Sequence, residues 1–207
     1  MITIIDTDVD VSAKLPQLKA QGVVSIGRYL NRRNPAGAKV IKPAEARAFA
    51  ANEMRLFLIY EFDGHPNNSI TGTLDGEWTM DYVKTIGAPL DGTAFIAYTV
   101  DYDAPESDMP GIKAAFTAFR AAITPAFMVG SYASGAVNAE LYAAKLIEVR
   151  WLTCSRGFRG TQQALANGDY EMRQSVPGEL IGLDIDPDTA HYANDTVGFI
   201  PFATVSA

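Results

Sequence analysis

Residues 97–103, an apolar stretch that closes on two acids, carry the clearest chemical signal in the sequence. Side chains alternate along a strand, so Asp101 and Asp103, two positions apart, are predicted to point the same way. Like charges held close together resist joint ionisation, and one of the two carboxyl groups is therefore expected to have a raised pKa. A protonated and an ionised carboxyl group are together what the cleavage of a glycosidic bond requires.

Three further predicted strands also end in acids, namely Asp6, Glu61 and Asp184, and Asp186 follows two residues later. Any one of these acids has an ordinary explanation, because polar residues are common where strands give way to turns. Their recurrence after the first, third, fourth and eighth predicted strands instead indicates carboxyl groups that meet at one place. Such a meeting requires parallel strands that end on a common face.

Apolar segments of strand length alternate with helical patterns along the whole chain. The predicted strands are 2–5, 23–30, 54–60, 93–100, 127–132, 149–154, 170–175 and 180–185. The predicted helices are 11–21, 43–52, 74–87, 108–123 and 136–147, with a short helix or loop at 159–167. Alternation of this kind is typical of parallel strands joined by helical crossovers.

Eight such units predict a closed (β/α)8 barrel of the TIM type, formed by one domain that spans residues 1–207. The chain is short for this fold, so some helices should be short or missing. The connection over 176–179 is too short for a helix, whereas a parallel neighbour needs a crossover of about a dozen residues. The barrel is therefore expected to be irregular toward its C-terminal end.

Other polar and aromatic residues are predicted at the same mouth. Arg28 and Tyr29 end the second strand, Tyr132 ends the fifth and Gln174 ends the seventh. Arg28 could hold a carboxylate, or could form a structural ion pair. The tyrosines suit sugars, whose apolar faces stack on aromatic rings, although ordinary packing explains Tyr132 equally well. Gln174 could hydrogen-bond a sugar or a carboxylate, or could act as a cap.

Other catalytic chemistries have weaker signals. His65 and His191, the two histidines, form neither an HxH nor an HExxH pattern, and the chain has no G-x-S-x-G sequence. The acid runs 6–10 and 184–188 lack the glycine and glutamate of a calcium-binding loop. Cys154 is the single cysteine and can form no internal disulfide. We therefore expect carboxylate chemistry without a metal or another cofactor.

The composition argues against some classes of binding partner. The 207 residues carry a net charge of −7, which argues against nucleic acid and against an anionic membrane surface. The N-terminal residues have no basic region followed by an apolar stretch, and no segment approaches the length of a membrane span. The expectation is a soluble protein made in the cytoplasm without a signal peptide.

Seven short motifs resemble, in order, those of the glycoside hydrolase-like family of DUF1906 (Rv2525c-like) domains. They are 5–7 (IDT), 27–30 (GRYL), 59–61 (IYE), 98–103 (YTVDYD), 129–135 (VGSYASG), 151–152 (WL) and 182–186 (GLDID). The resemblance extends from about residue 4 to about residue 188. Each motif is weak alone, and their order and spacing carry the specificity.

This family is similar in turn to the GH25 lysozymes, which are β/α-barrel muramidases acting on peptidoglycan. The resemblance implies that Asp6, Asp101, Asp103 and Asp184 match the acids at the mouth of the barrel. In the GH25 enzymes the motif after the fourth strand ends in the glutamate that donates the proton. This chain has the shorter Asp103 at that place, and Glu61 could supply the acid instead.

The sequence thus predicts a peptidoglycan hydrolase, such as a phage or prophage lysin, that works as a monomer on the cell wall once released or exported. Glu61 or Asp103 would donate the proton, and Asp101 or Asp6 would act as the ionised carboxylate. The residues expected at the catalytic centre are Asp6, Glu61, Asp101, Asp103 and Asp184, and those expected to bind the sugar are Arg28, Tyr29, Tyr132, Gln174 and Asp186. Two alternatives stay open: a glycan-binding module without turnover, and a hydrolase of an amide or ester linkage.

Overall fold

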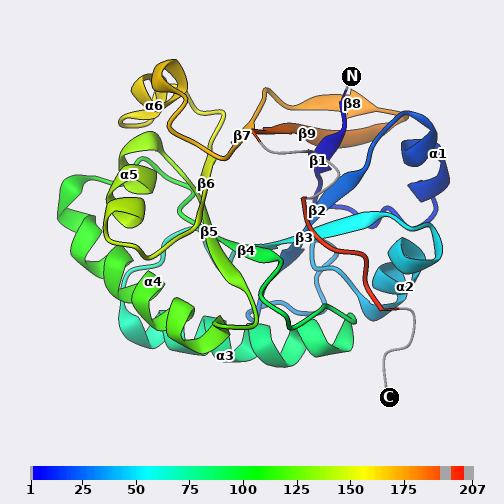
Figure 1. Cartoon of the computed structure of the whole chain (residues 1–207), viewed down its shortest axis with the longest axis horizontal. Coiled ribbons are helices and arrows are strands. Elements are labelled where there is room, and N and C mark those ends of the chain that lie inside the picture. The colour runs from blue at the N-terminus through cyan, green and yellow to red at the C-terminus, as the bar shows by residue number, and fades with distance from the viewer. Residues whose placement is uncertain (1, 192–196, 203–207) are drawn as a thin grey trace.

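The computed structural model describes residues 2–191 and 197–202 and shows a closed barrel, which confirms the predicted fold class (Figure 1). Its strands follow the order β1-β2-β3-β4-β5-β6-β7-β9, and β9 pairs back onto β1 to close the sheet. The strands are β1 (Ile4–Asp6), β2 (Ser25–Leu30), β3 (Arg55–Tyr60), β4 (Phe95–Thr99), β5 (Met128–Ala133), β6 (Val149–Leu152), β7 (Met172–Gln174), β8 (Gly178–Leu180) and β9 (Leu183–Ala190). The strands from β1 to β7 are parallel, so their carboxyl ends share one mouth.

Helices cover the outside of the barrel on the sides formed by the parallel strands (Figure 1). They are α1 (Leu15–Ala20), α2 (Pro43–Ala51), α3 (Ser69–Thr85), a 3-10 turn η1 (Glu106–Asp108), α4 (Met109–Ile123), α5 (Gly135–Ala143) and α6 (Thr161–Asn167). The start of α3 is capped by the Asn68 side chain, which accepts from the backbone N–H of Thr71 at 2.9 Å. Close packing of α3 on α4 depends on Gly72, where a Cβ would overlap the Ala115 carbonyl.

The C-terminal end of the barrel differs from the prediction of eight parallel strands. β9 is antiparallel to both β7 and β1, and β8 forms a hairpin with β9 outside the barrel wall. The hairpin reverses at Ile181 and Gly182, whose φ values of 50° and 74° suit a two-residue turn of the primed type. Residues 175–182, which include β8, separate β7 from β9 and are too few for a helical crossover. The chain therefore turns back on itself, and β9 begins at the mouth and runs antiparallel to β7.

The barrel interior is filled by an apolar cluster whose lowest layer contains Phe57 and Phe95. Phe57 on β3 packs against Phe95 on β4, with ring centroids 6.1 Å apart, and against Trp151 on β6 at 5.6 Å. Gly27 makes room for this layer, since a Cβ there would overlap the Phe57 ring. Side chains alternate along strands, so residues two and four positions beyond this layer also point inward and reach the mouth.

Candidate active site

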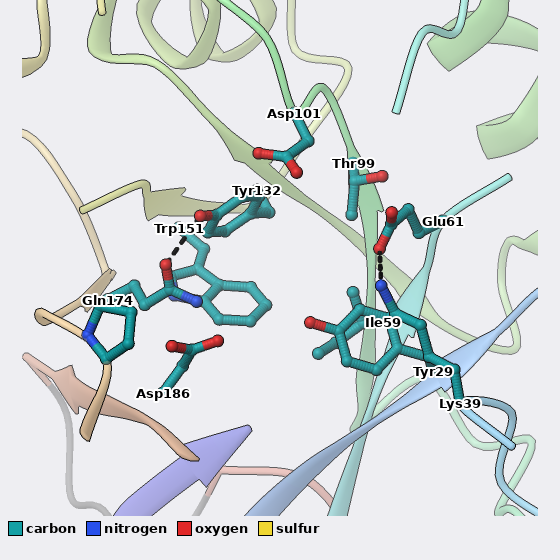
Figure 2. Close-up of a pocket in the computed structure, with 11 residues that line it drawn as sticks. Tyr29, Lys39, Ile59, Glu61, Thr99, Asp101, Tyr132, Trp151, Gln174 and Asp186 are labelled. Carbon is teal, nitrogen blue, oxygen red and sulfur yellow. Dashed lines mark hydrogen bonds and ion pairs between the residues drawn. The ribbon is translucent and has the colours of Figure 1, made fainter. Parts of the chain in front are cut away.

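Inward-pointing side chains at the mouth enclose a pocket of about 150 Å³ (Figure 2). The residues that line it are Tyr29, Lys39, Ile59, Glu61, Thr99, Asp101, Tyr132, Trp151, Gln174, Pro177 and Asp186. A groove of about 720 Å³ adjoins it along the β8–β9 hairpin and shares Tyr29, Lys39, Pro177 and Asp186 with it. Ligand sites commonly occupy roughly 300–1,000 Å³, so a bound oligomer would use pocket and groove together.

Asp101 stands at the rim of the pocket, two residues beyond the end of β4. Its backbone N–H donates to the Gly64 carbonyl at 3.0 Å, which ties it to the loop after β3. Burial raises the pKa of Asp101 and the negative charge of Glu61 raises it further, while Lys39 opposes both. A carboxyl group that keeps its proton to a higher pH than usual suits a general acid.

Glu61 is held in an ion pair. The Lys39 Nζ lies 2.6 Å from Glu61 Oε2 and 3.9 Å from the centroid of the Tyr29 ring (Figure 2). Lys39 reaches the pocket from the loop between β2 and α2. It lowers the pKa values of both Asp101 and Asp186, and so acts on the three carboxyl groups that line the pocket.

Asp186 lies across the pocket from Asp101, with Tyr132 and Trp151 between them in the view of Figure 2. It belongs to β9, where it pairs in register with Asp6 of β1. Burial is the main cause that raises the pKa of Asp186, and the charges of Asp8 and, to a smaller extent, Asp101 contribute in the same direction. The site therefore has two carboxyl groups on opposite walls, each with a raised pKa.

Asp6 lies below the pocket and is fully buried. Its Oδ1 accepts from the Tyr29 hydroxyl at 2.8 Å, and its Oδ2 accepts from Gln174 Nε2 at 3.1 Å. Gln174 Oε1 in turn accepts from the Tyr132 hydroxyl at 2.7 Å. Burial raises the pKa of Asp6 to about 7, and the charge of Asp186 adds to the effect. Asp6 thus orients three of the side chains that line the pocket.

Asp103 lies outside the pocket, where its Oδ1 accepts from the backbone N–H of Arg159 at 2.7 Å. The prediction that Asp101 and Asp103 point the same way is wrong. β4 ends at Thr99, so both acids lie in the following loop, where strand alternation no longer applies. The acid that the sequence motif predicted as a proton donor is therefore engaged elsewhere.

Two other predicted residues are also placed away from the pocket. Arg28 is fully buried and faces α2, with its Nε 2.8 Å from Glu45 Oε1. This orientation follows from alternation, since Tyr29 next to it faces inward. Asp184 is exposed near the start of β9 and lines the groove rather than the pocket. It does not end a strand as predicted, because β9 runs antiparallel to its neighbours.

The structure adds Lys39, Thr99 and Trp151 to the polar and aromatic residues of the pocket wall, and it places Asp188 behind Trp151. Thr99 and Trp151 carry a strand-alternation signal, because each lies an even number of residues from an inward-facing residue of its strand. Asp188 carries the same signal relative to Asp186. Lys39 could not be predicted from strand alternation, because it lies in a loop whose fold places its side chain over the Tyr29 ring. Within residues 2–191 and 197–202, no three His, Cys, Asp or Glu side chains are arranged to hold a metal ion.

Residues 16–179 match the family described as Rv2525c-like, glycoside hydrolase-like domain. The chain belongs to this family. A search of curated proteins gave no match. None of the helices in the described part of the chain combines the length and apolar character needed to cross a lipid bilayer.

Solved structures share the barrel at low sequence identity. The Tat-secreted protein Rv2525c of Mycobacterium tuberculosis, in complex with L-tartrate, has 16% identity and a TM-score of 0.75, over 92% of this chain and 96% of that one. An uncharacterized protein of B. stearothermophilus has 14% identity and a TM-score of 0.69, over 96% and 100%. The catalytic domain of endolysin ply40, from bacteriophage P40 of Listeria monocytogenes, has 13% identity and a TM-score of 0.59, over 92% and 93%. At these identities the likeness establishes the fold.

In this member of the family, the pocket provides carboxyl groups for acid–base chemistry and an aromatic surface on which a sugar ring could stack. Asp101 and Asp186 are carboxyl groups on opposite walls, and Tyr132 packs edge-on against Trp151 with centroids 4.9 Å apart. Aromatic walls with fixed hydroxyl and amide groups suit the apolar faces and hydroxyl groups of a sugar. The geometry is compatible with hydrolysis of a glycosidic bond.

Proposed function

We propose that the protein is a glycan hydrolase that cleaves the glycan strand of peptidoglycan or a related cell-wall polysaccharide. The observation that carries the proposal is the pair Asp101 and Asp186, which face each other across a pocket with aromatic walls. The family and the endolysin catalytic domain among its structural neighbours support a polysaccharide substrate. The protein would act as a monomer on the wall after release or export.

In the proposed mechanism, Asp101 gives its proton to the leaving glycosidic oxygen as the bond to the anomeric carbon breaks. The raised pKa of Asp101 supports this role. Ionised Asp186, on the other wall, stabilises the oxocarbenium-like transition state or activates the water that completes hydrolysis. Glu61 is less suited to donate a proton, because its carboxylate is paired with Lys39. Tyr132 and Gln174 position the sugar.

Digestion of purified cell walls, followed by mass spectrometry of the products, tests this mechanism. The wild type should release glycan fragments with new reducing ends, and Asp101→Asn and Asp186→Asn should each lose about 100-fold or more in rate. Asp81→Asn on the exposed face of α3 is the matched control and should keep the wild-type rate. Full activity in both folded site variants would contradict the mechanism. Release of free peptides with intact glycan would indicate an amide hydrolase.

A glycan-binding module without turnover is the second candidate. The observation that favours it is the placement of Asp103, which matches the lysozyme proton donor yet accepts from Arg159 outside the pocket. This candidate predicts that calorimetry detects binding to soluble wall fragments while the same preparation releases no reducing ends. Binding that weakens in Trp151→Ala, in a protein whose wild type releases no reducing ends from intact walls, would favour it over the hydrolase.

A further inference from the structure

Asp188 on β9 is a buried acid that the proposed mechanism does not use. Its Oδ1 accepts from the Trp151 indole Nε1 at 2.9 Å, and both side chains are almost fully buried. Trp151 forms part of the pocket wall, so Asp188 fixes one of the three aromatic side chains there. A carboxylate at this depth is costly unless its second oxygen is also satisfied.

The second oxygen of Asp188 meets no N–H or hydroxyl donor among the residues that the structure describes. Asp188 faces Ile4 on the neighbouring strand β1, so the carboxyl group beside it on that strand is the one of Asp6, two residues further along, which already accepts from Tyr29 and Gln174. Two ionised carboxylates are both acceptors and cannot form a hydrogen bond with each other. The contact becomes a hydrogen bond only when one carboxyl group carries a proton. Both oxygens of Asp6 already accept hydrogen bonds, whereas Asp188 Oδ2 has no other partner among the described residues, so Asp188 is then the donor and Asp6 the acceptor.

We propose that Asp188 is a positioning residue of the candidate site, and that one proton shared with Asp6 joins the two halves of the pocket wall. On one side the pair holds Trp151 through its indole N–H. On the other side Asp6 accepts hydrogen bonds from Tyr29 and Gln174, and Gln174 in turn accepts one from the Tyr132 hydroxyl. The positioning role rests on the proposed function, whereas the shared proton stands without it.

The electrostatics of the pair agree with this geometry. Burial is the largest cause that raises the pKa of Asp6 to about 7, and it raises the pKa of Asp188 well above the usual aspartate value. The titratable groups that face the pair are Asp186 from β9, whose charge adds to both shifts, and Tyr29 from β2. The groups from β6 and β7, Trp151 and Gln174, are neutral donors.

The raised pKa values of the pair determine how the stability of the folded protein changes with pH. Between the ordinary aspartate pKa of 3.8 and about 7, the folded protein holds protons on the pair that the unfolded chain has released. Stability contributed by the pair is therefore complete below about pH 4 and falls as the pH rises through 7. Each extra proton held by the folded state raises the unfolding constant up to tenfold per pH unit in this range.

Chemical denaturation at several pH values between 4 and 8 measures this slope. Asp188→Asn replaces the protonated acid by an isosteric amide that donates to Asp6 and accepts from Trp151. We expect its slope of log unfolding constant against pH to be smaller than that of the wild type by one proton or more. Asp184→Asn removes an exposed acid of the same strand and should follow the wild type. A slope in Asp188→Asn equal to that of the wild type would overturn the proposal.

The positioning role has its own readouts. Hydrogen exchange of the Trp151 indole N–H should stay slow in Asp188→Asn and accelerate at least tenfold in Asp188→Ala, which offers no acceptor. On cell walls, Asp188→Asn should keep the wild-type kcat, and Asp188→Ala should lose it. Loss of kcat in folded Asp188→Asn would contradict positioning by a neutral donor. If the wild type shows no wall activity, the proposed function fails, while the slope and exchange rates still decide whether the proton is shared.

Discussion

At the scale of single residues, one lysine organises the charges of the site. Lys39 is paired with Glu61 at 2.6 Å and lies against the Tyr29 ring. Its charge opposes the raised pKa values of both Asp101 and Asp186, and His65 adds to this effect at Asp101. The position of this ammonium group therefore lowers the pH at which the two opposing acids titrate, against the larger effect of their burial.

Replacing this lysine should move the pH optimum. In Lys39→Met, the pKa values of Asp101 and Asp186 both rise further, because the charge that lowers them is gone. Both limbs of a bell-shaped rate profile on cell walls should shift to higher pH by about 0.5–1 unit, since a partly screened charge contributes on the order of 1 kcal/mol.

The control for this change is Lys84→Met, which removes an exposed lysine of α3 that is paired with Asp81. Its profile should coincide with that of the wild type. A carboxyl ¹³C titration of Asp101 provides a second measurement that needs no substrate. An unchanged or lowered inflection in Lys39→Met would show that Lys39 does not set the charge of the site.

At the scale of elements, strand periodicity predicts most of the site and loop geometry accounts for the rest. Tyr29, Tyr132 and Gln174 face inward as alternation requires, and the barrel could be predicted because helix and strand patterns alternate along the chain. Arg28 is adjacent to Tyr29 on β2, so strand alternation predicts that its side chain points to the opposite face, toward the helices. Where a chain leaves its strand, as it does before Asp103, alternation carries no information.

The direction of the last barrel strand shows a second limit of sequence patterns. The short connection before β9 indicates an irregular end, but a pattern of apolar residues reads the same in parallel and antiparallel strands. Only the pairing of β9 with β1 brings Asp186 opposite Asp6 and moves Asp184 out to the groove. Contacts between residues distant in sequence thus decide which acids of one segment reach the pocket.

The Arg28–Glu45 pair joins β2 to α2 and is completely buried. Burial raises the pKa of Glu45 even though Arg28 opposes this shift, so the desolvation of the carboxylate outweighs the attraction. Arg28→Met should therefore cost about 3–5 kcal/mol in unfolding free energy, because it leaves Glu45 buried without its partner. Urea denaturation measures the loss.

The double variant Arg28→Met/Glu45→Leu removes both charges and should be more stable than the single variant. Lys19→Met breaks an exposed pair with Glu53 and should change stability by no more than about 1 kcal/mol. Equal losses in the single and double buried variants would mean that the unpaired carboxylate is not the source of the cost.

At the scale of the whole molecule, the net charge of −7 is concentrated partly at the mouth. Asp8, Glu179 and Asp184 line the groove, and Asp186 lies where groove and pocket meet. Closure of the sheet by β9 causes this concentration, because it brings an acid-rich segment beside β1. A polymer that carries negative charges is repelled by such a mouth before it reaches the pocket.

Salt should therefore accelerate the digestion of peptidoglycan, which carries carboxylate groups of its own. Raising the ionic strength from about 0.01 M to about 0.15 M shortens the screening length from roughly 30 Å to roughly 8 Å, which removes most of the long-range repulsion. The rate at low substrate concentration should rise over this range. Asp8→Asn/Glu179→Gln should flatten the rise, whereas Glu77→Gln/Asp81→Asn on α3, with the same change in net charge, should preserve it. A rate that falls with salt would show that the wall is attracted to the mouth, and the acids of the groove would then need a cationic partner on the substrate.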